Sequence, residues 1–211
     1  MKSIQEVLQK LTIPCSDRSI TQFQDYFKYL HQWNKVHNLT SIPEGNKSII
    51  IHLYDSLSLY PHVKNHHHIM DVGSGAGLPG VLLAIAQPDL ELTLVECSHK
   101  RCAFLRHVRH KLGLKNVLII NKRVESLPPS LSYDLVLTRA FAPLNTQWRY
   151  IEHLLDENAY ILAMKGKIQP EEIVRSTQHI YAIIKLPPTA EIHHRHLIKL
   201  KKKPAVSRGT K

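Results

Sequence analysis

Hydrophobic and polar positions follow two rhythms along the chain, and the change between them falls near residue 67. Before it, apolar residues recur at steps of three and four, which mark one face of a helix. After it, short apolar runs alternate with helical stretches, as in a parallel α/β sheet. The pattern predicts a helical N-terminal cap over residues 1–66, an α/β domain over residues 67–200 and a basic tail over residues 201–211, all in one compact unit.

The predicted cap contains two well-marked helices. Ser16 or Asp17 is expected to cap the first, and the second is predicted over residues 47–59, with Pro61 ending it. The apolar face of the first helix consists of Ile20, Phe23, Phe27, Leu30 and Trp33.

The α/β part is predicted to hold five parallel strands and a closing antiparallel pair. The first strand begins at Ile69 and runs into a glycine-rich turn. The other strands are predicted at residues 92–95, 117–120, 133–138, 159–164, 183–186 and 196–200. The helices between them are predicted at residues 81–86, 99–112, 144–155 and 171–180.

The glycine-rich turn contains Gly73, Gly75 and Gly77, and an acid, Asp71, lies two residues before the first of them. A dinucleotide fingerprint needs its third glycine one place later, where this chain has Leu78. The D-x-G-x-G-x-G spacing instead resembles the first motif of S-adenosylmethionine-dependent methyltransferases. Glycines in such a turn let the backbone approach a ligand that any Cβ would meet.

Further candidate contacts follow the later strands, because ligands of open α/β sheets lie outside the carboxyl ends of the strands. Glu96 follows the second strand, where an acid can accept both ribose hydroxyls. After the third strand, the Val124 main-chain N–H and the Glu125 carboxylate are placed to contact an adenine edge. Arg139 and Lys165 follow the fourth and fifth strands. A single such acid is more often solvated or ion-paired, so the cofactor hypothesis depends on all of them together.

The charge balance favours an anionic partner. The chain has 28 Lys and Arg against 17 Asp and Glu, a formal charge of +11 before its fifteen histidines are counted. Nucleic acid is the first expectation and an acidic membrane the second. No apolar run approaches the ~20 residues of a membrane span, and the N-terminus lacks an apolar signal core. Three cysteines without C-x-x-C spacing indicate reduced thiols, no metal site and a cytoplasmic location.

Seven motifs stand in a fixed order along the chain. They are Trp33-Asn34 with Asn38-Leu39-Thr40, His52 with Asp55-Ser56-Leu57, Asp71 to Gly80, Lys100-Arg101 with Phe104-Leu105, Arg123-Val124-Glu125, Arg139-Ala140-Phe141-Ala142 and Lys165-Gly166. Together they resemble the glucose-inhibited division protein B family, bacterial methyltransferases that modify guanine N7 in small-subunit ribosomal RNA. The resemblance covers nearly the whole chain to about residue 200.

The resemblance implies a Rossmann-like class I methyltransferase fold with S-adenosyl-L-methionine as cofactor. Its sheet would have seven mostly parallel strands, with an antiparallel last strand, behind a helical N-terminal cap. Two positions depart from the family: Ile51 stands where a basic residue is frequent, and Leu78 where Phe is common. The family's cofactor contacts correspond to Gly73, Leu78, Val124, Glu125 and Arg139.

The implied acceptor simplifies the chemistry. Guanine N7 has an in-plane lone pair and no proton to lose, so catalysis reduces to proximity and alignment. The chain agrees in lacking Asn-Pro-Pro-Tyr, Asp-Pro-Pro-Tyr or a cysteine after the fourth strand. We expect Arg139 to touch both cofactor and guanine, with Lys165 as a second positioning residue. The alternative for Arg139 is an ion pair with Asp71 or Glu125.

The expected partner is small-subunit ribosomal RNA or the 30S subunit, bound by a monomer. The basic helix around Lys100 would contact phosphates, although each of its cations is equally compatible with a solvated helix face. His52 and Asp55 are expected to form a structural hydrogen-bonded pair. The residues predicted to contact RNA are Asn38, Lys100, Arg101, Arg106, Arg123 and Lys202.

Two other functions are compatible with parts of the sequence. A dinucleotide-dependent oxidoreductase is disfavoured by Leu78 and by the lack of a convincing Tyr-x-x-x-Lys. A basic RNA-binding module without catalysis is disfavoured by the intact glycine turn together with Glu96 and Glu125. The sequence leaves open which guanine is modified, and whether free RNA or an assembled subunit is the substrate.

Overall fold

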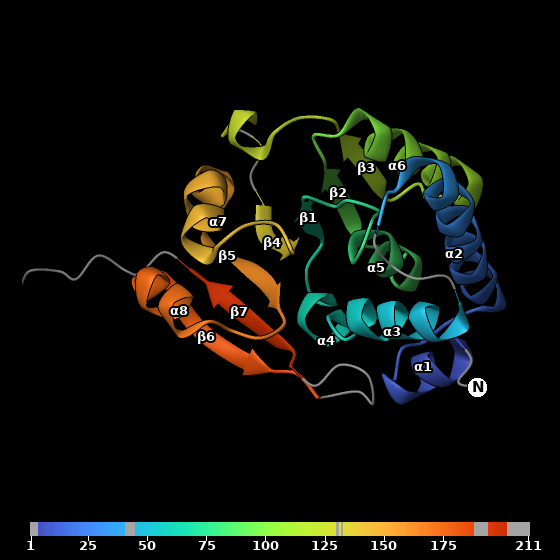
Figure 1. Ribbon diagram of the computed structural model, residues 1–211, viewed down its shortest axis with the longest axis horizontal. Coiled ribbons are helices and arrows are strands. Elements are labelled where there is room, and N and C mark those ends of the chain that lie inside the picture. The colour runs from blue at the N-terminus through green and yellow to red at the C-terminus, as the bar shows by residue number, and fades with distance from the viewer. Residues whose placement is uncertain (1–3, 41–44, 130, 132, 188–193, 202–211) are drawn as a thin grey trace, which may run out of the picture.

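The computed structural model describes residues 4–40, 45–129, 131, 133–187 and 194–201. A seven-stranded sheet crosses the molecule and carries helices on both faces (Figure 1). The strands are β1 His68–Val72, β2 Glu91–Val95, β3 Val117–Ile120, β4 Tyr133–Arg139, β5 Leu155–Lys165, β6 Ile180–Lys185 and β7 His196–Leu200. The helices are α1 Ile4–Lys10, α2 Asp17–His37, α3 Asn46–Leu57, α4 Tyr60–Val63, α5 Gly80–Ala86, α6 His99–Leu112, α7 Leu144–Ile151 and α8 Pro170–Ser176, with 3₁₀ turns at Val124–Ser126 and Glu152–Leu154.

The strand order is β3-β2-β1-β4-β5-β7-β6, with β7 antiparallel to both of its neighbours. The remaining neighbours pair in parallel, so Val72 of β1 lies beside Val95 of β2 and Thr138 of β4. The chain runs outward from β1 to β3 and then crosses back to β4, which places the switch of direction between β1 and β4. Ligands of open α/β sheets bind at such a point. The predicted fold class and the closing antiparallel pair are confirmed.

Each face of the sheet has its own apolar core. Helices α1 to α6 cover one face, and α7 with the 3₁₀ turns covers the other. The first core joins Phe27 of α2 and Leu57 of α3 to Ile85 of α5. The predicted cap therefore packs against the α/β part in a shared core. The Tyr26 hydroxyl also donates to the Ala76 carbonyl (2.7 Å), which ties α2 to the glycine-rich turn.

Three predicted helix ends are wrong, and the strands predicted at residues 159–164 and 183–186 begin earlier, at Leu155 and Ile180. Pro61 does not end a helix over 47–59; α3 stops at Leu57, and Pro61 lies in the first turn of α4, where its missing N–H costs nothing. The helix predicted over 144–155 stops at Ile151, because Leu155 already pairs with Tyr133 in the sheet. The helix predicted over 171–180 stops at Ser176 and β6 begins at Ile180.

Candidate active site

The turn between β1 and α5 is held in shape by its own backbone. Gly73, Gly75 and Gly77 have φ values of +69°, +57° and +87°, a region that L residues rarely adopt. The Ser74 hydroxyl donates to the Asp71 carbonyl (2.7 Å), and the Gly77 N–H donates to the Ser74 carbonyl (2.7 Å). The turn therefore needs glycine at three alternate positions for conformational reasons alone.

The three glycines face different surroundings. A Cβ on Gly77 would lie 2.4 Å from Val81, and one on Gly73 would lie 2.7 Å from the Phe141 ring. A Cβ on Gly75 would meet nothing closer than the Gly73 carbonyl oxygen at 3.7 Å. Gly77 thus serves packing beneath the turn, Gly73 lies under Phe141, and Gly75 borders open space where a ligand can approach.

Asp71 is buried at the end of β1, beneath this turn. Its Oδ2 accepts a hydrogen bond from the Gly80 N–H (3.1 Å), at the start of α5. Its Oδ1 has no hydrogen-bond partner within the described ranges. Burial raises the pKa of Asp71 to about 7, against the opposing influence of the Gly80 N–H and of Arg139. Asp71 therefore supports the turn and retains one free buried acceptor.

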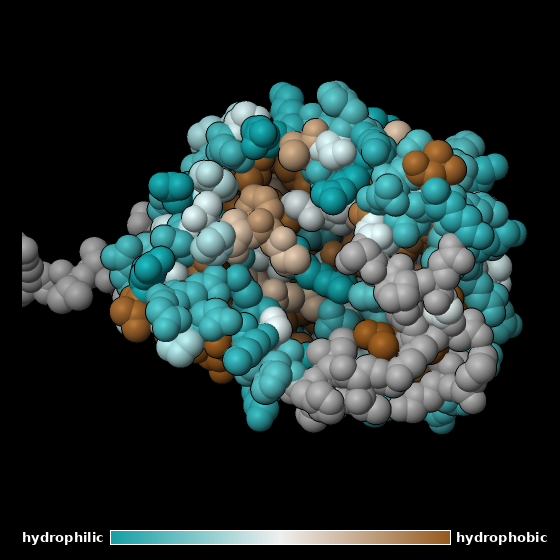
Figure 2. All heavy atoms as spheres, in the orientation of Figure 1, coloured by the Kyte–Doolittle hydropathy of each residue, from teal (hydrophilic) through white to brown (hydrophobic). Residues whose placement is uncertain are grey.

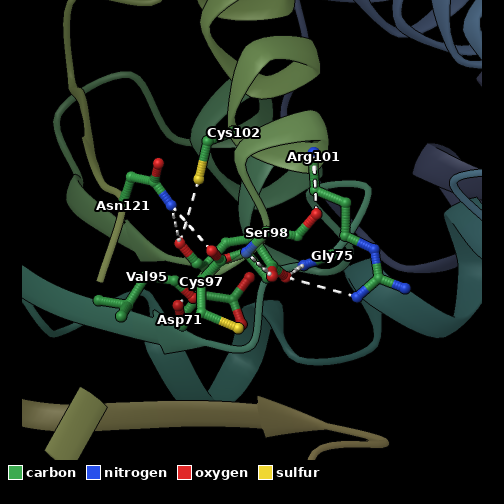
Figure 3. Close-up of polar contacts among 10 residues, drawn as sticks. Asp71, Gly75, Val95, Cys97, Ser98, Arg101, Cys102 and Asn121 are labelled. Atoms are coloured by element: carbon green, nitrogen blue, oxygen red, sulfur yellow. Dashed lines mark hydrogen bonds and ion pairs between the residues drawn. The ribbon is translucent and has the colours of Figure 1, made fainter. Parts of the chain in front are cut away.

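Glu96, which directly follows β2, holds the turn in place, and Figure 3 shows its partners Gly75, Ser98 and Arg101 close together. Its Oε2 accepts from the Gly75 N–H (2.9 Å), and its Oε1 accepts from the Ser98 N–H (2.8 Å). The carboxylate is 4% exposed, and the Arg101 guanidinium lies 3.7 Å from it. Glu96 thus joins the glycine turn to the start of α6, in addition to any hydroxyl that it accepts from a ribose.

Two side chains that the sequence analysis did not place in the site hold the Glu96 main chain. The Asn121 amide donates to the carbonyls of Glu96 (3.0 Å) and Cys97 (3.1 Å), and the Cys102 thiol donates to the Glu96 carbonyl (3.1 Å). Figure 3 shows Asn121 and Cys102 converging on the main chain between Val95 and Ser98. Asn121 directly follows β3, so its place at a strand end was the available signal.

A pocket of about 100 Å³ opens between the carboxyl ends of β1, β2 and the turn after β3. It brings together five residues that the sequence predicted, and Figure 2 shows the surface hollowed between the α7 side and the α6 side. Phe141 and Tyr150 also line it and were not predicted as contacts. The predicted residues in its wall are Gly73, Glu96, Arg123, Val124 and Glu125.

Arg139 stands at the end of β4, on the other side of β1. One of its terminal nitrogens, NH2, donates to Nδ1 of His52 (3.1 Å) and lies 3.6 Å from Oδ2 of Asp55. The other, NH1, is buried and has no hydrogen-bond partner among the described residues. Burial, and then the Arg139 charge, lower the pKa of His52 to about 4, so its ring is neutral at pH 7 and accepts this hydrogen bond.

The alternative role of Arg139, an ion pair with Asp71 or Glu125, is wrong: among the described residues, the carboxylate within 4 Å of its guanidinium is that of Asp55. His52 and Asp55 lie three residues apart on α3 and face the end of β4 together. Their expected structural pairing with each other is replaced by a shared contact with Arg139. A helix of the N-terminal cap thus supplies part of the site.

Lys165, at the end of β5, is held by Glu172 of α8. Its Nζ donates to Oε1 of Glu172 (2.6 Å) and to the Ala142 carbonyl (3.3 Å). The same Glu172 oxygen accepts from the Leu144 N–H (2.9 Å), at the start of α7. Lys165 therefore fixes the loop that follows Arg139, and its amine is already paired. The sequence offered no signal for Glu172 beyond an acid early in a predicted helix.

The residues predicted to contact RNA do not form a single group in the structure. Lys100, Arg101 and Arg106 lie exposed on α6, where the surface in Figure 2 is mostly hydrophilic. The Lys100 amine donates to the His37 carbonyl (3.3 Å), and the neighbouring Asn38 caps α2 with a φ of +48°. Lys100 at the start of α6 therefore lies beside the end of α2, next to Asn38. Arg123 instead lines the pocket. Lys202 lies outside the described residues.

Comparison with known proteins decides the family. The family model described as rRNA small subunit methyltransferase G matches residues 19–197. The chain belongs to this family. It is 38% identical to the ribosomal RNA small subunit methyltransferase G of Alteromonas mediterranea, with 93% of each chain covered. It is 36% identical to that of Chromobacterium violaceum, with 93% of this chain and 95% of the relative covered.

Solved structures show the same fold at low identity. A variant of MtNAS in complex with S-adenosylmethionine matches with a TM-score of 0.57 and 15% identity, covering 95% of this chain and 84% of that one. A SAM-dependent methyltransferase from Aquifex aeolicus matches with a TM-score of 0.54 and 15% identity, covering 71% and 90%. The predicted family, the methyltransferase activity and the S-adenosylmethionine cofactor are confirmed.

Two negative findings concern the described part of the chain. No helix in it combines the length and the apolar character that a membrane span requires. Within the same ranges, no group of three or more His, Cys, Asp or Glu side chains is arranged to hold a metal ion.

Replacing Glu96 by Ala is expected to weaken S-adenosylmethionine binding by about tenfold to a hundredfold, since hydrogen bonds to a charged group are worth ~1.5–3 kcal/mol each. The substitution removes the predicted ribose acceptor and also the hydrogen bond that the Gly75 N–H donates to Glu96. Isothermal titration would measure the effect. Glu91→Ala, at the exposed opposite end of β2, is the matched control and should bind as the wild type does. Wild-type affinity in Glu96→Ala would place the ribose elsewhere.

Proposed function

We propose that this methyltransferase transfers the methyl group of S-adenosylmethionine to N7 of a guanine in 16S ribosomal RNA. The observation that carries the proposal is the Arg139 guanidinium beside the glycine turn, with one buried nitrogen that no described protein group uses. Arg presents a planar set of donors that fits guanine O6. Because N7 has no proton to lose, a fixed donor that orients the base serves its methylation without a proton acceptor.

The residues at the pocket fit the cofactor. Gly75 leaves the backbone open to a ligand, Glu96 can accept ribose hydroxyls at its rim, and Asp71 keeps a buried oxygen free. Val124 and Glu125 line the same pocket, which supports their proposed contact with the adenine edge. When bound, S-adenosylmethionine supplies a methyl group on a positively charged sulfur, so the cofactor carries the reactive chemistry.

The protein's share of the catalysis is then orientation. Guanine N7 attacks with its own lone pair, so no side chain has to remove a proton. Arg139 holds the base in plane, and the neutral His52 ring keeps that guanidinium from rotating. Lys165 fixes the loop behind it through the Ala142 carbonyl. Well-oriented reacting groups can supply ~7–11 kcal/mol of the barrier.

The charge of the protein also indicates its substrate. We propose that a monomer in the cytoplasm binds either free 16S ribosomal RNA or the assembling 30S subunit. Support comes from the +11 formal charge and from the exposed cations along α6. Such a surface favours phosphate contacts through counterion release.

The test is transfer of labelled methyl groups from S-adenosylmethionine to 16S ribosomal RNA, given as naked RNA and as 30S subunits. Mapping of N7-methylguanosine then locates the product. Label found in an exocyclic amine or in a pyrimidine would overturn the N7 assignment. Tight RNA binding without label would support the rival of a binding module that has lost catalysis, and binding of NADH in place of S-adenosylmethionine would support an oxidoreductase.

Replacing Arg106, Arg109 and Lys111 together by Gln is expected to lower RNA affinity and flatten its salt dependence. These three cations lie exposed on α6, and each lost phosphate contact reduces the slope of log affinity against log salt by ~0.7–0.9. Arg101 is left in place, because it lies 3.7 Å from Glu96 and its loss would disturb the cofactor site. Filter binding at several salt concentrations measures the slope.

The control removes the same number of charges from α7, α8 and β6, at the other end of the sheet, by Arg149→Gln, Arg175→Gln and Lys185→Gln (Figure 1). Its slope should stay closer to that of the wild type. An equal loss in both triple variants would show that total charge, and not the α6 face, binds the RNA.

A further inference from the structure

Arg195 is a buried arginine that the proposed reaction does not use. Its side chain is 3% exposed and lies between the start of β7 and α3. Nε donates to Oδ1 of Asp55 (2.9 Å), NH1 donates to the Pro187 carbonyl (3.1 Å), and NH2 donates to Ser58 Oγ (2.6 Å) and to the Asp55 carbonyl (3.2 Å). All three guanidinium nitrogens are therefore taken by protein groups.

Asp55 stands between Arg195 and Arg139. Its Oδ1 accepts the short hydrogen bond from Arg195, whereas its Oδ2 lies 3.6 Å from the Arg139 guanidinium. The carboxylate is 14% exposed, so its charge is poorly screened by water. Arg195 is the closer of the two cations and therefore neutralises most of the negative charge of Asp55. As a result, Asp55 attracts Arg139 only weakly.

This looseness leaves Arg139 with a free donor. Its NH2 is shared between His52 and Asp55, and its NH1 is buried without a hydrogen-bond partner in the described part of the chain. Without Arg195, the Asp55 carboxylate would attract the whole Arg139 guanidinium. Arginine and carboxylate groups favour a bidentate pair with two parallel hydrogen bonds, which would occupy NH1 as well.

We propose that Arg195 is a positioning residue for the methyl transfer: it neutralises Asp55 and thereby keeps the NH1 of Arg139 free for the guanine. The inference rests on the proposed function and adds a residue that keeps Arg139 in its working position. It also explains why an arginine near the C-terminal strand reaches across to a helix of the N-terminal cap.

The central test replaces Arg195 by Met. Turnover of 16S ribosomal RNA should fall by roughly tenfold to a hundredfold, the range of one lost charged hydrogen bond. The KM for RNA and the calorimetric affinity for S-adenosylmethionine should stay near the wild-type values. Adding Asp55→Asn to Arg195→Met removes the charge that captures Arg139, so the double variant should recover turnover.

Two further variants separate positioning from mere support. Arg195→Lys keeps a cation beside Asp55 and should retain most turnover, even though it loses the forked contacts. Ser58→Ala removes the 2.6 Å contact of Arg195 but leaves the Asp55 pair intact, so it should lower the melting temperature without lowering turnover. Loss of one partner of a buried ion pair is destabilising, so each rate is measured well below the melting transition of that variant.

Three outcomes would overturn the proposal: unchanged turnover in Arg195→Met, no recovery in the double variant, or turnover that follows melting temperature in all variants including Ser58→Ala. Should Arg195→Met not fold, the comparison of the double variant with Arg195→Lys and Ser58→Ala decides in its place. An inactive wild-type enzyme would instead refute the proposed function, so the two failures are distinguishable.

Discussion

Gly75→Val is expected to yield a folded protein whose affinity for S-adenosylmethionine falls by at least about a hundredfold. Gly75 has a φ of +57°, where a β-branched residue costs roughly 1–3 kcal/mol of strain. Its Cβ would also project into the open space beside the turn, since the nearest protein atom is 3.7 Å away. Isothermal titration and circular dichroism would measure affinity and fold.

Gly113→Val is the matched control for this experiment. Gly113 ends α6 with a φ of +63°, and a Cβ there would likewise meet nothing closer than 3.7 Å. The control carries the same backbone strain away from the pocket, so it should lose stability and keep its cofactor affinity. Equal affinities in folded Gly75→Val and wild-type protein would refute the assignment of this turn to the cofactor.

The sequence predicted the main features of the fold because they depend on local pattern. The apolar runs that form β1 to β4 are short and end at polar or turn residues, so they could be predicted as strands that alternate with helices along the chain. Errors arose where apolar residues suit both a helix and a strand, as at Leu155. There the choice is made by pairing with Tyr133, a partner 22 residues earlier that no local pattern reveals.

The candidate site was predictable to the extent that its residues follow strand ends. Gly73, Glu96 and Val124 meet in one pocket because parallel strands bring their carboxyl ends to one edge. The partners of Arg139 could not be found in this way. His52 and Asp55 come from a cap helix, and their approach to β4 depends on how α3 packs against α5.

Glu96 shows a second limit of sequence reasoning. An acid after the second strand suggests a ribose acceptor, and its position in the pocket wall agrees with that role. The structure adds two backbone donors, from Gly75 and Ser98, that the carboxylate already accepts. One residue thus shapes the turn and borders the ligand, so a variant at Glu96 changes both together.

Arg139→Ala is expected to reduce turnover by about a hundredfold, the cost of a modest misplacement of reacting groups. RNA affinity should change little, because one contact at the base adds little to a wide basic surface. S-adenosylmethionine affinity should be measured in parallel, because the family resemblance implies a cofactor contact for Arg139 although this residue does not line the pocket wall that holds Glu96 and Val124. Single-turnover methylation and filter binding would separate the two quantities.

Two variants complete the design for Arg139. Arg106→Ala, on the exposed face of α6, should show the opposite result, with weaker RNA binding and unchanged single-turnover rate at saturating RNA. Arg139→Lys keeps the charge but loses the planar guanidinium that fixes the direction of NH1, so it should remain impaired if guanine is recognised through that donor. Normal turnover in Arg139→Ala would move the guanine pocket away from the end of β4. Full activity in Arg139→Lys would instead mean that a positive charge at this position is sufficient.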